Sequence, residues 1–135
     1  MKNKYLLFTF ALLCFSMTCD NDVSTNCESV DYNIAFQAQS EKSYCISGDI
    51  QIRVDSLVNA LCPCNARCVQ AGEIIAFLSV EEGEKVTQYL VGSENGSEVI
   101  DQLSFKIEEY ALVETCSGSN PSPEVATVAL TVTRE

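Results

Sequence analysis

Three cysteines stand close together near the middle of the chain, at Cys62, Cys64 and Cys68. Thiolates at this spacing could wrap a single Zn²⁺ or Cu(I) ion, or they could form disulfides in an oxidising compartment. The chain contains no histidine, and no methionine lies near these cysteines, so the common partner ligands of such metals are missing. We therefore predict disulfides here, and we expect no bound metal and no cofactor.

The start of the chain has the features of an export signal. Lys2 and Lys4 make it basic, and an apolar run follows over residues 5–15. This order is typical of a secretory signal peptide, and the run is shorter than the ~20 helical residues that span a bilayer. The alternative is a buried N-terminal helix, but a helix that is apolar on every side needs a larger protein to cover it. We predict a signal peptide over residues 1–18.

Cys19 stands directly after that predicted segment. Ser16 and Thr18 are small enough for a peptidase to cut before Cys19, whose thiol could then carry a diacylglycerol, so this stretch resembles a bacterial lipobox. Ordinary signal-peptidase cleavage at the same bond is the alternative. Lipidation at Cys19, with acyl chains such as palmitate, would hold the protein on a membrane, because each buried CH₂ contributes about 0.8 kcal/mol.

The cysteine count favours lipidation over simple secretion. Cys14 would leave with the signal peptide and the lipid would occupy Cys19, so six of the eight cysteines would remain. Without lipidation seven would remain, and an odd free thiol is unusual in an oxidising compartment. Our preferred pairing joins Cys62 to Cys68, and the other four make two more bridges. The six disulfide candidates are Cys27, Cys45, Cys62, Cys64, Cys68 and Cys116.

No catalytic set is visible in the sequence. Without histidine, the Ser-His-Asp and Cys-His arrangements are impossible and the commonest general base is missing. Cys62-Pro63-Cys64 also differs from the Cys-x-x-Cys at a helix N-terminus that redox enzymes use. The carboxylates at 81–84 and 108–109 stand where a solvated turn or edge would place them. We therefore predict that the protein is not an enzyme.

The net charge of −11 limits the partners of this chain. Phosphate binding needs a basic patch, so the acidity argues against nucleic acid as a partner. It also argues against electrostatic attachment to anionic lipid. Attachment to a membrane would therefore have to come from the lipid on Cys19.

The elements that must position the cysteines are β-strands. Apolar and polar residues alternate over 30–38, 50–54, 99–107 and 125–133, which is the period of half-buried strands. Residues 73–80 are apolar on both faces, as in a central strand, and 86–91 returns after a hairpin loop that contains Gly83. Shorter strands are expected at 44–46 and 110–115. Residues 55–72 show no sustained period, and we interpret them as a cross-linked loop with a helical turn near 56–60.

About seven or eight short strands without an ordinary helix indicate an all-β fold. We predict a disulfide-stapled antiparallel β sandwich, Ig-like or related. With 135 residues there is room for one domain. The expected organisation is a signal peptide over 1–18, a polar, lipid-attached flexible tether over 19–28, and a single β domain over 29–135.

One stretch carries a resemblance to known proteins. The run Cys62-Pro63-Cys64-Asn65-Ala66-Arg67-Cys68-Val69-Gln70-Ala71-Gly72 resembles the Cys-Pro-x₄-Cys-Val-x-Ala-Gly signature of a group of small, uncharacterised bacterial lipoproteins. In that group the motif follows a strand ending in Asp-Ser, and here Val54-Asp55-Ser56 precedes it. The resemblance implies a β-rich envelope domain and brings no activity with it.

The sequence thus predicts a lipid-anchored protein of the bacterial cell envelope with a non-catalytic binding or structural role. It would sit on the periplasmic or surface face of the outer membrane. Its expected partners are the membrane, through Cys19, and an unknown protein or small molecule, but not nucleic acid. The alternative is an inhibitor, an enzyme or a metal-binding protein that acts through the Cys62–Cys68 loop, which disulfides would hold rigid for presentation.

Overall fold

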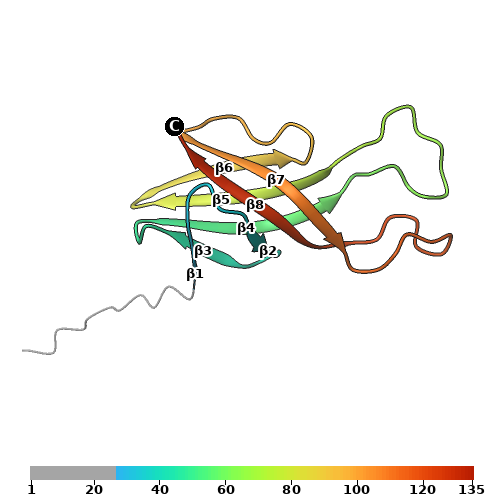
Figure 1. The fold of residues 1–135 in the computed structure, drawn as a ribbon, viewed down its shortest axis with the longest axis horizontal. Coiled ribbons are helices and arrows are strands. Elements are labelled where there is room, and N and C mark those ends of the chain that lie inside the picture. The colour runs from blue at the N-terminus through green and yellow to red at the C-terminus, as the bar shows by residue number, and fades with distance from the viewer. Residues whose placement is uncertain (1–26) are drawn as a thin grey trace, which may run out of the picture.

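The structure is a computed structural model that describes residues 27–135. This part of the chain is an all-β sandwich of eight strands, as the sequence predicts, and it contains no helix that could cross a membrane (Figure 1). The predicted signal peptide and the predicted lipidation site at Cys19 lie outside the described residues. The strands are β1 (Glu28–Val30), β2 (Phe36–Ala38), β3 (Ser43–Ile46), β4 (Ile50–Asn59), β5 (Ile74–Glu82), β6 (Lys85–Gly92), β7 (Leu103–Leu112) and β8 (Val125–Arg134).

The strands form two sheets that face each other. The larger sheet has the order β1-β3-β4-β5-β6, and the smaller has the order β2-β8-β7. All pairings are antiparallel except that of β1 with β3, which is parallel. Cys27 and Glu28 already belong to the folded domain, because Cys27 is bonded to Cys45 and Glu28 pairs with Tyr44. The domain therefore begins slightly before residue 29.

The single strand expected over 30–38 is wrong, because the chain forms two strands there and changes sheets between them. Asn33 adopts a φ of 61°, in the left-handed region, and its backbone N donates to Val132 O at 2.8 Å. This turn sends β1 to the larger sheet and β2 to the smaller. The alternation identifies inward side chains only at its two ends, since Val30 and Ala38 are buried whereas Ile34 in the turn is 59% exposed.

Two further expectations fail at irregular backbone. The strands expected at 99–107 and 110–115 are one strand, β7, which begins only after Asp101 and Gln102 turn the chain with positive φ angles. The helical turn expected near 56–60 is instead the end of β4, which contains a bulge between Val54 and Ser56. The bulge places Asp55 and Ser56 on the same outer face, so the alternation breaks although the strand continues.

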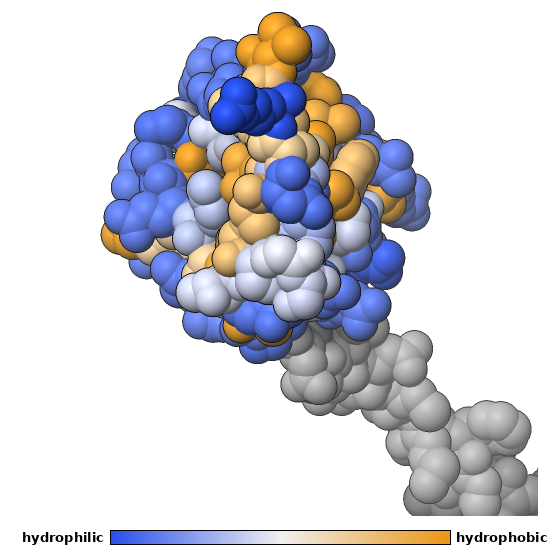
Figure 2. Space-filling view, turned by 90° about the vertical axis from the view of Figure 1, so that its right-hand side faces the viewer, coloured by the Kyte–Doolittle hydropathy of each residue, from blue (hydrophilic) through white to orange (hydrophobic). Residues whose placement is uncertain are grey.

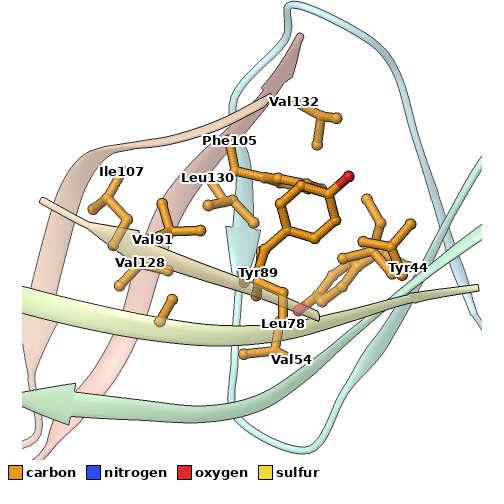
Figure 3. Packing of buried hydrophobic residues seen from close by; sticks show 14 of the residues in the cluster. Tyr44, Val54, Leu78, Tyr89, Val91, Phe105, Ile107, Val128, Leu130 and Val132 are labelled. Carbon is orange, nitrogen blue, oxygen red and sulfur yellow. The ribbon is translucent and has the colours of Figure 1, made fainter. Parts of the chain in front are cut away.

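The core lies between the sheets and is made by the inward residues of both (Figure 3). Leu78 and Leu130 are completely or almost completely buried, and the ring centroids of Tyr89 and Phe105 lie 4.6 Å apart across the interface. Tyr44 connects the sheets through hydrogen bonds as well. Its hydroxyl donates to Gln37 O and accepts from the backbone N of Gln39, both at 3.0 Å, and burial raises its pKa. No described side-chain polar atom is buried without a partner.

Asp55 is expected to make the stability of the domain depend on pH. The hydrogen bond from Ser79 is the largest cause and lowers the pKa of this carboxyl; burial opposes it, and the hydrogen bond and positive charge of Arg53 lower the pKa further. Since the folded-state pKa lies below the ordinary value of 3.8, the stabilisation is present above that value and is lost as the pH falls through the folded-state pKa. Urea midpoints of the parent and Asp55→Asn, compared from about pH 6 to pH 2, should therefore converge towards low pH. A difference that stays constant over this range would contradict the assignment.

Candidate functional site

Two long loops lie at one end of the sandwich. Loop 60–73 connects β4 to β5, and loop 113–124 connects β7 to β8; they are the green and orange-red loops that project at the right of Figure 1. Each loop begins and ends at a pair of neighbouring strand residues: Asn59 pairs with Ile74, and Leu112 pairs with Val125. We call these two segments together the paired loops.

Disulfides close and connect the paired loops. Cys62 is bonded to Cys68 within the first loop, with 5.9 Å between their Cα atoms, and this is the pairing that the sequence analysis preferred. Cys64 is bonded to Cys116 in the second loop, with 6.1 Å between the Cα atoms. The remaining bridge, between Cys27 and Cys45, joins the start of the domain to β3. All six disulfide candidates are therefore paired.

Hydrogen bonds fix the base of loop 60–73. The backbone N of Ala60 donates to Glu73 O at 3.0 Å, and that of Cys62 donates to Ala71 O at 2.8 Å, so the β4–β5 hairpin continues past the strand ends. Gly72 closes this base with a φ of 73°, and a side chain there would collide with the carbonyl oxygen of Ala60. A glycine is therefore required at this position.

Further hydrogen bonds hold the two loops against each other. Asn59 Nδ2 donates to Pro123 O at 2.7 Å, and the backbone N of Cys64 donates to Pro121 O at 3.1 Å. Pro123 is fully buried, so the second loop is anchored in the domain as well as bonded to the first. The sequence analysis did not find these contacts. The two prolines in 121–123 were visible in the sequence, but nothing there showed which segment they face.

The tip of loop 60–73 is open to solvent. Every residue from 64 to 72 is exposed, and Val69 is fully so. Residues 60–72 carry one cation, Arg67, and no carboxylate, in a chain whose net charge is −11. Figure 2 looks onto this end and shows a stripe of pale to deep orange, apolar residues down its centre, with hydrophilic residues on both sides. The tip of loop 60–73 thus offers an exposed surface with one positive charge and no negative charge.

This surface carries four cysteines, Cys62, Cys64, Cys68 and Cys116. All four of its cysteines are in disulfides, so none is a thiolate that could bind a metal or attack a substrate. Within residues 27–135, no three His, Cys, Asp or Glu side chains lie close enough together to hold a metal ion. The two bridges and the hydrogen bonds at the base form a frame that holds Arg67, Val69 and their neighbours exposed to solvent.

No protein-family model, curated protein or solved structure matches this chain. The geometry of the paired loops and the chemistry of their exposed residues are therefore the observations from which a function is inferred.

Proposed function

We propose that this protein is a lipid-anchored component of the bacterial cell envelope that recognises a partner through the paired loops and is not an enzyme. The observation that carries the proposal is the exposed run 64–72, held by two disulfides and by hydrogen bonds to a second loop. The proposal includes membership of the group of small bacterial lipoproteins whose cysteine motif this stretch resembles.

Rigidity supports recognition rather than a purely structural role. Ordering a loop upon binding costs about 0.5–1.5 kcal/mol for each immobilised flexible side chain, and a pre-formed loop avoids part of that cost. The Cys62–Cys68 and Cys64–Cys116 bridges order the loop before any partner arrives. Both bridges lie at an exposed end of the domain, so besides stabilising the fold they hold the accessible run 64–72 in one shape.

The position of the loops fits an anchor at Cys19. β1, the first described strand, lies beside β3, which pairs with the Ile50–Arg53 part of β4. Loop 60–73 starts at the other end of β4, about 20 Å further along the strand at ~3.3 Å per residue. With a lipid at Cys19, the paired loops would point away from the membrane, where a partner can reach them.

The inhibitor alternative has one specific observation in its favour. Ala66 N donates to Pro63 O in a turn, but residues 67–70 make no backbone–backbone hydrogen bond within the described part of the chain. An exposed segment with Arg67 and unpaired backbone groups could lie in the cleft of an arginine-specific protease, which binds its substrates as extended chains. The identity of the cross-linked partner in the experiment below decides between this and non-inhibitory binding.

Photo-cross-linking in the native envelope tests the proposal. With benzoylphenylalanine in place of Val69, we expect one discrete protein adduct after irradiation, because this side chain stands at the tip of the loop. The matched control carries the same group in place of Val86, another exposed valine, which lies on β6 at the opposite end of the sandwich. No adduct at Val69, or the same adduct from both positions, would overturn the proposal.

A further inference from the structure

The outer face of the larger sheet carries a second feature, separate from the paired loops. The registers of β4, β5 and β6 place its outward side chains in two neighbouring cross-strand rows. Arg53, Ser79 and Gln88 form the first row, and Ser56, Phe77 and Leu90 form the second. The β4 bulge inserts Asp55 between the rows. A polar row and a mostly apolar row therefore lie side by side on one rigid sheet.

This face is hollowed at the boundary between the rows. A hollow of about 420 Å³ is lined by side chains of both rows, including Arg53, Asp55, Phe77, Ser79 and Gln88. A neighbouring hollow of about 310 Å³ shares Arg53 and Asp55 with it and is also lined by Glu41. The larger volume lies in the range of roughly 300–1,000 Å³ that small-molecule sites occupy.

The polar groups in the hollow are held in place before any ligand arrives. Arg53 Nε donates to Asp55 Oδ1 at 2.8 Å, and Ser79 Oγ donates to Asp55 Oδ2 at 2.6 Å. The terminal guanidinium N–H groups of Arg53 remain as donors, and both Asp55 oxygens keep acceptor capacity. Gln88 adds a further donor and acceptor. A ligand with several hydroxyl groups could use all of them.

Two partly exposed apolar side chains lie directly beside these polar groups. Phe77 is 39% exposed and Leu90, its direct neighbour across β5 and β6, is 56% exposed. Large apolar side chains on the solvent face of a sheet gain nothing from that exposure, and an aromatic ring there can pack against an apolar ligand face. The ligand is therefore expected to be amphipathic, with an apolar face and a polar edge.

Charge narrows the class of ligand. The positive charge of Arg53 and the negative charge of Asp55 cancel within the ion pair, so the hollow offers no unpaired charge for an ionic ligand. The chain as a whole has a net charge of −11 and repels anions such as phosphorylated or sulfated sugars. A neutral ligand is favoured.

We propose that the outer face of β4–β6 binds a neutral saccharide. The C–H face of a pyranose ring packs on Phe77, and its hydroxyl groups hydrogen-bond to Arg53, Asp55 and Gln88. This site is separate from the paired loops. The domain would therefore bind a saccharide in addition to the partner proposed for those loops. An exposed sheet face of this kind could also contact a protein, and the experiment separates the two.

The test is an NMR titration of the ¹⁵N-labelled domain with neutral hexasaccharides of glucose, mannose, galactose, xylose and N-acetylglucosamine, each to about 10 mM. We expect at least one to shift the backbone signals of Phe77, Ser79 and Gln88, with a dissociation constant in the millimolar range or below. Phe77→Ala and, separately, Gln88→Ala should weaken that binding about tenfold or more. Gln88 is exposed, so its variant keeps the fold intact.

Tyr110→Ala is the matched control, because Tyr110 is an aromatic residue of similar exposure, 44%, on the smaller sheet. The affinity of the Tyr110→Ala variant for the bound hexasaccharide should equal that of the parent protein. No shifts with any of the hexasaccharides, or binding that Phe77→Ala and Gln88→Ala leave unchanged, would overturn the proposal and favour a protein contact at this face. Neither outcome bears on the paired loops, whose test uses the cross-link at Val69.

Discussion

Replacing Cys64 and Cys116 together by serine is expected to lower the free energy of unfolding by about 4 kcal/mol. This bridge spans a sequence separation of 52 residues, and a cross-link restricts the unfolded chain more when the loop that it closes is longer. The folded state also loses the only covalent connection between the two segments of the paired loops. Urea unfolding of the parent and the double variant, followed by circular dichroism, measures the difference.

The other bridges provide internal controls for that result. By the same chain-entropy estimate, removal of Cys27–Cys45, with a separation of 18, should cost about 3 kcal/mol. Removal of Cys62–Cys68, with a separation of 6, should cost about 2 kcal/mol. The reverse order, with the short bridge contributing most, would mean that local strain or residual structure controls the stability of this end. Repeating the photo-cross-linking at Val69 in each cysteine variant would then show which bridge the paired loops need in order to form the adduct.

Leu78→Ala is expected to destabilise the domain by about 3 kcal/mol. Leu78 lies on the central strand β5 and is almost completely buried, with the other inward side chains of both sheets around it (Figure 3). Truncation removes apolar contacts and leaves a cavity. β5 is hydrogen-bonded to β4 on one side and to β6 on the other, so it cannot easily move to close that cavity. The measurement is the shift of the urea midpoint at an unchanged m-value.

Leu90→Ala is the matched control for the core variant. Leu90 sits on the adjacent strand β6 and points to the outer face, where it is 56% exposed. Its truncation should change stability by no more than about 0.5 kcal/mol. Equal losses for the two leucines would contradict the assignment of inner and outer faces, and with it the side-chain rows on which the saccharide site is built.

The two proposed sites divide the domain into surfaces with different chemistry. The paired loops present exposed residues on a frame that disulfides hold rigid, and this suits a protein partner. The outer sheet face offers a hollow with prearranged polar groups beside Phe77, and this suits a small, hydroxyl-rich ligand. If both proposals hold, the protein would bind a glycan through one surface while it contacts a second protein through the other.

Regular strands were predictable from the sequence because their alternation is local. A half-buried strand must place every second side chain in the core, so the first half of β4, the first half of β7 and β8 show the period of two without reference to their partners. The β5–β6 hairpin was equally visible, and Gly83 has the positive φ angle that its turn requires. The cysteine count was another signal in the sequence: with Cys14 in the predicted leader and Cys19 assigned to the lipid, an even six remained, which pointed to complete pairing.

The strand boundaries predicted from the sequence were wrong at two places where the backbone departs from regular strand geometry. The bulge at Asp55 looks like the end of a strand, because a one-residue insertion reverses the alternation although β4 and β5 pair on both sides of it. The opposite error occurred at Asn33, where the alternation runs unbroken through a turn between two sheets. In both places the backbone conformation depends on hydrogen bonds to strands far away in the sequence, such as that from Asn33 N to Val132 O.

Alternating residues, the absence of histidine and the cysteine count established an all-β, disulfide-bonded domain from the chain alone, since each is a property of composition or of near neighbours. Folding was needed to join Cys64 to Cys116, to bring Pro121 and Pro123 against loop 60–73, and to align Arg53, Ser79 and Gln88 across three strands. These contacts connect residues that are distant in the sequence. Strand register and the packing of two sheets determine them, and no local pattern encodes either.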